Sequence, residues 1–569
     1  MFAALPSLNG RRARILLACA IALGVLGGVA STKGPSFYPD DPLSREPESR
    51  DASRAEPRQI GSLYEMVDNL FVTARYKPSG VRAMNINTID EVPDSSWFTN
   101  RIGTAPLAAE ALVRGPNVGA PPDPSRWVLI REKSAGAHPG FTAKDASGET
   151  WFLEFDPKPF PEGATAAVEI ATKIFWAFGY NQVESFLTTF DPRHVEIDPA
   201  ATVRRPSGEK TPFTRDDMNA ILEQVARNPD GTYRVIAGRL LHGKILGGFT
   251  YDGTRPDDPN DIVPHEHRRE LRALRVFGAW ANLTDLKAGN TLDVLVAENG
   301  RSTVRHYLQD VGSTFGMCND LHEWDLSWEH FYQGDTTLRR LFSLGFALSP
   351  WQTVQYVEYP SVGKFEGDRF DPRTWRPQTP TAAYMELRDD DAFWAARRVA
   401  AFTDDLIRAA VHTGQFSDPA AEKYLGDVLI KRREKIKRAY LPAVNPIVEP
   451  RLDADGRLKF ENAAVAAGVV SVPVTYRASW HHFDNATGAT RPIARTEASA
   501  TTIDAPDNLP ATSGSFIEVQ VAADADGHPS WQRPVRIHFR RDGANWTLVG
   551  LERLAAGASA ESNAVASGR

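Results

Sequence analysis

The sequence predicts a mixed α+β protein that ends in a β-sandwich domain. Three stretches lead to this prediction. Residues 127–179 show three short strands followed by a helix, residues 391–438 show three helices, and residues 469–551 alternate apolar and polar positions between turns. With 569 residues the chain is longer than one hydrophobic core normally serves, so we expect two or three domains.

The composition argues against one class of partner. The chain is 42% hydrophobic and 24% charged, with a formal net charge of −7, as in many globular proteins. A mildly acidic surface is repelled by phosphate backbones, so we expect no nucleic-acid partner.

The first 30 residues are typical of a bacterial signal peptide. Arg11, Arg12 and Arg14 precede an apolar run over residues 15–29, and small residues lie just before Ser31. The run is shorter than the roughly 20 apolar residues that span a bilayer, which favours cleavage. An uncleaved membrane anchor is the alternative that the pattern leaves open. We therefore expect an exported protein, periplasmic or extracellular.

Two segments separate this signal from the first strand. Residues 31–60 are rich in Pro, Asp, Glu, Arg and Ser and cannot fold alone, so we expect an extended or disordered leader. Residues 61–125 form an N-terminal extension. Apolar residues at helical spacing predict an amphipathic helix over residues 60–74, and Trp97 and Phe98 are expected to pack onto the main domain.

Three strands are predicted over residues 127–130, 141–144 and 150–155. The loop between the first two contains Lys133, Gly136 and Gly140. A glycine loop between strands can bring backbone N–H groups close to phosphates. Glycine also marks turns of every kind, so an ordinary hairpin loop is the simpler interpretation.

A helix is predicted next, over residues 164–179, ending at Gly179. It carries Glu169 among apolar neighbours, where a carboxylate either faces solvent or needs a buried partner. Strands are expected within residues 183–197 and 233–250. A helix over residues 265–281 then leads the chain to Asp285.

The stretch over residues 277–316 contains the strongest candidate site. Asp285 is followed five positions later by Asn290, and a hairpin with a turn at residues 298–300 places Asp310 at the end of its second strand. The hairpin brings Asn290 and Asp310 near each other. Carboxylate and amide oxygens are the ligands that a hard divalent cation such as Mg²⁺ takes.

The C-terminal half is predicted with fewer alternatives. Helices near residues 391–401, 404–412 and 419–438 are preceded or begun by Asp391, Thr403 and Asp418, which we interpret as N-caps. We expect a β-sandwich over residues 445–555, with no catalytic constellation, and a disordered tail over residues 556–569.

This order of elements resembles the protein-kinase-like fold, in particular the divergent HipA-like and secretory or spore-coat kinases, over residues 126–440. The chain is also similar to uncharacterised bacterial secreted proteins with the pattern GTRPDDPND…HEHRREL. The resemblance implies an N-lobe over residues 126–250 and a helical C-lobe over residues 251–444. It implies Mg²⁺ and ATP as cofactors, Asp285 as the catalytic aspartate, Asn290 and Asp310 as metal ligands, and Glu169 as the helix glutamate.

The sequence departs from the kinase pattern in three ways. Glu154 stands where the third strand should offer a lysine to the phosphates, with Lys133 or Lys158 as neighbouring substitutes. Asp285 lacks the preceding His-Arg pair. An exported protein also meets little ATP.

Two functions therefore remain open. The first is a pseudokinase-like binding or scaffold module, in which the β-domain engages a protein or envelope partner without any cofactor. The alternative is an atypical Mg²⁺-dependent phosphoryl or nucleotidyl transferase that uses Asp285, Asn290 and Asp310. No membrane contact is expected beyond an uncleaved N-terminal anchor.

Overall fold

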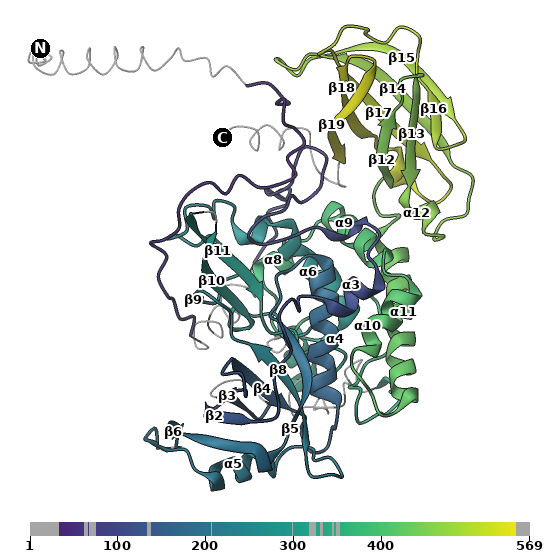
Figure 1. Cartoon of the computed structure of the whole chain (residues 1–569). Helices are drawn as coiled ribbons and strands as arrows, with labels where there is room; N and C mark the ends of the chain where they lie inside the picture. Colours follow the sequence, from purple (N-terminus) through teal and green to yellow (C-terminus); the bar gives the residue numbers. More distant parts are fainter. Residues whose placement is uncertain are drawn as a thin grey trace, which may run out of the picture.

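A computed structural model describes residues 34–61, 67, 76–133, 138–205, 207–298, 300–317, 326–330, 334–343, 346, 348 and 353–553. The chain is a mixed α+β protein in which a large sheet, a group of helices and a set of C-terminal sheets follow one another in sequence (Figure 1). Within these ranges no helix is both long enough and apolar enough to cross a bilayer.

The large sheet has seven strands in the order β5-β8-β4-β3-β2-β6-β7. Its first three strands form the antiparallel meander that the sequence predicts. One face packs on α5, and Trp151, Leu153 and Phe155 of β4 point into that core. The strands are β2 (Trp127–Glu132), β3 (Gly140–Lys144), β4 (Thr150–Phe155), β5 (Ser185–Phe190), β6 (Val195–Arg204), β7 (Lys210–Pro212) and β8 (Tyr233–Arg239), and α5 spans Arg215–Leu222.

A second, three-stranded sheet contains the predicted hairpin. Its order is β11-β10-β9, with β9 at Lys244–Gly247, β10 at Thr291–Glu298 and β11 at Arg301–Leu308. Glu298 pairs with Arg301, so the hairpin turns where the sequence places its turn residues. Helix α4 (Gly163–Phe178) contacts β4, β5 and β8 of the large sheet, is almost entirely buried and ends at Gly179 as predicted.

Helices α6 and α8 to α11 form the main core with α4, whereas none of the described side chains of α7 belongs to it. Thr403 and Asp418 cap α10 and α11 as predicted, each accepting a bond from a backbone N–H of the first turn. The expected cap at Asp391 is wrong, because α9 begins earlier and Asp391 is a buried third-position residue that accepts from the Arg388 N–H. The helices are α3 (Ala109–Arg114), α6 (Arg269–Ala281), α7 (Gly334–Phe342), α8 (Ala382–Met385), α9 (Asp389–Ala400), α10 (Asp404–His412) and α11 (Pro419–Tyr440).

The C-terminal residues form two sheets, in agreement with the predicted β-structure. The alternation that the sequence shows from residue 469 corresponds to a strand only from Thr475 onward. The face-to-face packing of a sandwich stays a prediction. One sheet has the order β12-β13-β16, with strands at Ile447–Leu452, Arg457–Asn462 and Thr502–Asp504. The other has the order β15-β14-β17-β18-β19, with strands at Thr490–Ala498, Thr475–Phe483, Phe516–Asp524, Val535–Asp542 and Asn545–Arg553.

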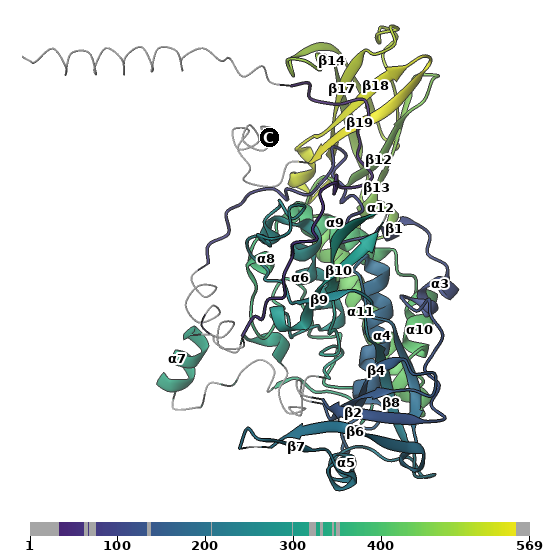
Figure 2. The same cartoon turned by 60° about the vertical axis from the view of Figure 1, so that its left-hand side comes forward.

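Residues 34–61 are extended, which is the first of the two alternatives expected for the leader, and they are held by contacts with the rest of the chain. We call this segment the strap. Figure 2 shows it in purple between the C-terminal sheets and β9. Ala52 and Ala55 are fully buried against the second sheet, and the Arg58 N–H donates to the Leu246 carbonyl. The strap has too little apolar surface to fold alone, but a preformed surface supplies its contacts. The helix expected over residues 60–74 lies almost wholly outside the described residues.

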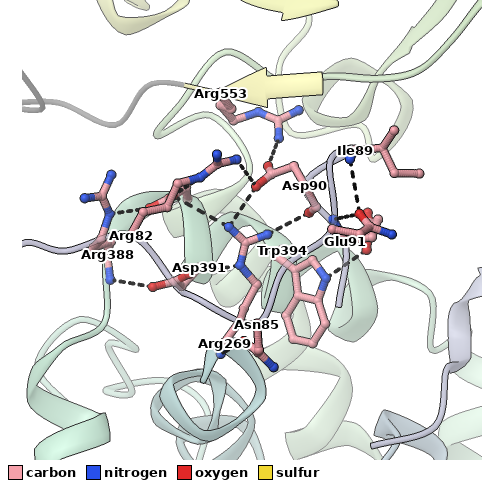
Figure 3. A network of polar contacts seen from close by, with 12 residues as sticks. Arg82, Asn85, Ile89, Asp90, Glu91, Arg269, Arg388, Asp391, Trp394 and Arg553 are labelled. Carbon is pink, nitrogen blue, oxygen red and sulfur yellow. Dashed lines mark hydrogen bonds and ion pairs between the residues drawn. The ribbon is translucent and has the colours of Figure 1, made fainter. Parts of the chain in front are cut away.

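A buried charge network connects the strands and helices that surround the core (Figure 3). Asp90, in the N-terminal extension, forms ion pairs with Arg82, with Arg269 on α6 and with Arg553 at the end of β19. Arg269 also pairs with Asp391 on α9 at 2.9 Å. The network therefore fixes α6, the helix that delivers Asp285, against the extension, α9 and the last strand.

Candidate functional site

Helix α6 ends in a way that fixes the next residues. Asn282 adopts the left-handed conformation with φ 59°, which asparagine tolerates better than most residues. Its side-chain oxygen accepts a bond from the Trp375 ring N–H at 2.9 Å. Two residues on, the Thr284 N–H donates to the Ser313 carbonyl at 3.1 Å. The loop that carries Asp285 is thereby tied to the segment after Asp310.

Asn290 holds this loop together from its other end. Its side-chain N–H donates to the Asp285 carbonyl at 2.8 Å, while its own carbonyl accepts from the N–H groups of Gln309 and Asp310, each at 3.0 Å. The short helix η5 (Ala288–Asn290) places the amide at the entry to β10. Asp285, Asn290 and Asp310 are therefore brought together, as the hairpin argument predicted.

The surroundings of the Asp310 carboxylate shift its pKa. One of its oxygens accepts from the Gly312 N–H at 3.0 Å, and water reaches the side chain. Loss of solvation among the surrounding protein atoms, followed by the negative charge of Glu154, raises the pKa of Asp310, and Lys133 opposes the rise. The solvent access limits how far desolvation can go. Glu154 and Lys133 are thus close enough to act on Asp310.

Sequence reasoning missed Lys287. Its ammonium pairs with the Asp285 carboxylate at 2.7 Å and is 41% exposed. The signal was present in the sequence, since Lys287 lies two positions after Asp285 and only three before Asn290. This pair supplies a cation beside the candidate catalytic carboxylate.

Lys133, at the end of β2, provides the second cation. Its ammonium lies 2.7 Å from the Glu154 carboxylate on β4, and both side chains are partly exposed. Lys158, the other suggested substitute, is exposed. A lysine from β2 therefore approaches the place where the kinase pattern expects a lysine from β4.

Of the two glycines in the predicted loop, the structure describes only Gly140. Gly136 lies outside the described residues. A Cβ at Gly140 would lie 2.2 Å from the Leu153 carbonyl oxygen, so only glycine allows β3 to approach β4 there. The structure gives Gly140 a packing role.

Glu169 is buried, and its charged partner lies on its own helix. Its carboxylate pairs with Lys173, one turn along α4, at 3.1 Å, and accepts from the Ser185 hydroxyl at 3.3 Å. Desolvation raises its pKa despite Lys173. Because Lys173 lies four residues away on the same face, it satisfies Glu169 locally, and Lys133 pairs with Glu154 instead.

A cavity of about 350 Å³ brings Lys133, Glu154 and Asp310 onto one surface. The large sheet, α4, the β8–β9 connection and the second sheet contribute its walls, and most of its lining is apolar. The lining residues are Arg131, Lys133, Phe141, Thr142, Phe152, Leu153, Glu154, Val168, Thr172, Val183, Ser185, Ile236, Gly238, Arg239, Leu240, Leu241, Ile245, Leu292, Gln309, Asp310 and Val311. We call this cavity the cleft. Of the two candidate lysines, it is Lys133 and not Lys158 that lines it.

The charged groups of the cleft do not form an all-protein metal cage. Throughout the part of the chain that the structure describes, no group of three or more His, Cys, Asp or Glu side chains is placed to hold a metal ion. Any cation in the cleft would therefore draw some of its ligands from a bound molecule or from water.

Comparison with known proteins gives distant structural matches. No family model and no curated protein matches the chain. The Golgi casein kinase with Mn/ADP bound is similar at 8% identity, covering 58% of this chain and 74% of its own, with a TM-score of 0.29. The Helicobacter pylori proinflammatory kinase CtkA is similar at 11% identity, covering 56% and 95%, also with a TM-score of 0.29. Scores this low carry no argument, so the function is inferred from the geometry of the chain itself.

Proposed function

We propose that the cleft belongs to a kinase-like domain, with residues 126–250 and 251–444 as its two lobes, and that it transfers a phosphoryl group from a nucleotide to a hydroxyl acceptor. The observation that carries the proposal is the locked group of Asp285, Asn290 and Asp310 beside an apolar cavity. Phosphoryl transfer requires mainly positioning and charge neutralisation, so this small set is sufficient.

The residues present fit a Mg²⁺ ion that is bound together with a nucleotide. Asp310 uses one carboxylate oxygen for the Gly312 N–H, which leaves the other for a cation. The side-chain N–H of Asn290 is committed to Asp285, so its amide oxygen is the atom of that side chain suited to a metal. Mg²⁺ is usually held by one or two protein oxygens together with phosphates and water. When bound, it would neutralise phosphate charge.

The other residues of the site would have separate roles in the transfer. Asp285 would orient and accept the proton of the attacking hydroxyl, as the aspartate of a kinase catalytic loop does. Lys287, held at 2.7 Å from Asp285, would stabilise negative charge on the transferred group. Lys133 would have to break its ion pair with Glu154 in order to pair with the phosphates. The apolar walls would take the planar base.

The pairing of Lys133 with Glu154 favours a second candidate, a binding module without catalysis. In that case Glu154 repels phosphates and keeps Lys133 from them. As part of this candidate we propose that the protein is exported and that its C-terminal sheets engage a protein or envelope partner.

Thermal-shift titration with ATP and either Mg²⁺ or Mn²⁺ tests the nucleotide site, with transfer of labelled phosphate to the protein or a generic acceptor measured in parallel. A metal-dependent shift that Asp310→Ala abolishes supports the site. Asp285→Asn should keep the shift and lose transfer. Asp507→Asn, at an exposed aspartate in the turn after β16, is the control for charge loss.

The outcomes separate the two candidates. A shift without transfer in the wild type rejects the transferase but shows that the cleft binds nucleotide. The absence of any shift at millimolar nucleotide rejects the transferase and is the result that the binding module predicts, since Glu154 repels phosphates in that module. A shift that survives Asp310→Ala rejects the assignment of the metal ligands.

A further inference from the structure

A second cavity shares the β8–β9 connection with the cleft. It has a volume of about 250 Å³ and is enclosed by the N-terminal extension, the segment after α4, this connection and β11. Arg239, Leu240 and Leu241 line both cavities. We call it the rear pocket. None of the charged groups or metal ligands assigned to the proposed transfer reaction lines it.

The rear pocket contains an arginine that no carboxylate contacts directly. Arg101 on β1 (Arg101–Ala105) donates to the Trp176 carbonyl at 2.7 Å, and its guanidinium lies 4.5 Å from the centre of the Trp176 ring. Across the described residues, Arg101 forms no salt bridge with a carboxylate. Desolvation lowers its pKa to about 10, with Asp94 opposing the fall from a distance, so it stays protonated at neutral pH. A partly buried cation without a directly bound counter-charge favours an anion.

The other arginines of the rear pocket differ from Arg101 because carboxylates already neutralise them. Arg239 pairs with Glu184 at 2.7 Å, and Arg305 pairs with Glu298. Arg101 is therefore the charge that a ligand would complement. Its guanidinium presents N–H groups in a planar fork that matches a carboxylate or phosphate.

A second, independent observation comes from Gln182. It lines the rear pocket and is only 5% exposed, yet neither its amide oxygen nor its amide nitrogen has a hydrogen-bond partner among the described residues. Buried amides are nearly always bonded to protein or to water. The guanidinium of Arg101 is bonded to the carbonyls of Trp176 and Tyr180 but has no carboxylate partner among the described residues, and the amide in the same pocket has no partner, so the site favours a polar anionic molecule that completes it.

We propose that the rear pocket binds a small organic anion. Its carboxylate or phosphate pairs with Arg101, a polar edge bonds the Gln182 amide, and its apolar body lies against Leu240 and Leu241. The volume suits a molecule with a single ring better than a nucleotide. This site does not depend on the proposed phosphoryl transfer. Leu240 and Leu241 also line the cleft, so a ligand in the rear pocket would contact a segment that forms part of the cleft wall.

Isothermal titration of the full chain with benzoate and phenyl phosphate tests the proposal, with orthophosphate and chloride at equal ionic strength as reference anions and no nucleotide present. We expect saturable binding of at least one aromatic anion. Arg101→Gln should weaken it by about tenfold or more, because a bond to a charged group is lost. Arg204→Gln, an exposed arginine on β6 outside the pocket lining, should leave it unchanged.

Gln182→Met separates binding from folding. Methionine has a similar size and no amide to leave unpaired, so the ligand-free protein should melt at an equal or higher temperature while binding weakens. Absence of saturable binding at millimolar aromatic anion would overturn the proposal. Equal weakening by Arg101→Gln and Arg204→Gln, or binding of orthophosphate alone, would also overturn it. Asp310→Ala should not change the titration, which keeps this test distinct from that of the cleft.

Discussion

Replacing Asp90 by asparagine removes the charge at the centre of the network in Figure 3. One carboxylate oxygen accepts from Arg82 at 2.7 Å and Arg269 at 2.8 Å, and the other accepts from Arg553 at 2.8 Å. Asparagine suits the backbone, because Asp90 has φ 64° in the left-handed region. The substitution keeps one acceptor oxygen but turns an amide N–H₂ group towards an arginine, so that two donors face each other.

The size of the effect follows from which arginines lose a counter-charge. Removing one partner of a buried ion pair costs about 3–5 kcal/mol, because a buried charge is left uncompensated. Arg269 and Arg553 have side-chain exposures of 0% and 3%, whereas Arg82 keeps 25% and can turn to water. Arg269 retains Asp391. We therefore expect a loss near the lower limit, about 3 kcal/mol at neutral pH.

The loss should depend on pH. Burial alone would raise the pKa of Asp90, but the charges of Arg269, Arg82 and Arg553 outweigh it and hold that pKa far below its ordinary value. A carboxyl with a lowered folded pKa stabilises the fold above its unfolded pKa, and this contribution is lost as the pH falls through the folded pKa. The difference between the wild type and Asp90→Asn should be constant above about pH 5 and shrink below about pH 4.

Hydrogen exchange measured by mass spectrometry is the suitable assay, because a chain of this size does not unfold in one step. Peptides from α6, α9 and β19 should exchange faster in Asp90→Asn, while peptides from β2 to β4 should not change. Asp507→Asn is the control. A change below about 0.5 kcal/mol in the free energy of opening of the α6 peptides, the usual range for surface substitutions, would refute the argument. Equal acceleration of exchange in peptides of the large sheet would also refute it.

Three further predictions concern the cleft and the strap. The raised pKa of Asp310 means that its ionised form is disfavoured in the fold. Asp310→Asn should therefore raise the melting temperature of the metal-free protein at pH 7, but not at low pH, where the carboxyl is protonated. A lower melting temperature at pH 7 would contradict this. The ring centres of Phe37 and His538 lie 4.9 Å apart. Phe37→Ala should therefore weaken the docking of the strap by about 1–2 kcal/mol and speed its proteolysis. Unchanged cleavage would show that the Phe37 contact is dispensable. A Cβ at Gly247 would lie 1.9 Å from the Arg58 carbonyl oxygen, so Gly247→Ala should displace the strap and accelerate exchange of the Arg58 amide; unaltered exchange would reject the close contact.

Local patterns in the sequence were sufficient wherever neighbours along the chain decide the structure. The β2–β4 meander, the end of α4 at Gly179 and the β10–β11 hairpin follow from alternation, capping and turn chemistry that act over a few residues. The same hairpin explains why the approach of Asn290 to Asp310 was predictable. The short interval between Asp285 and Asn290 added the third member.

Contacts between distant segments were decided only by the tertiary structure. Lys133 meets Glu154 because β2 and β4 flank β3, and Glu169 is satisfied by Lys173 once α4 is buried. Composition left open whether the leader is extended or disordered, because it measures whether a segment can fold alone and not whether another surface will hold it. Likewise, no local pattern could place Arg101 and Gln182 in one pocket, because burial and pairing depend on which elements surround a side chain after folding.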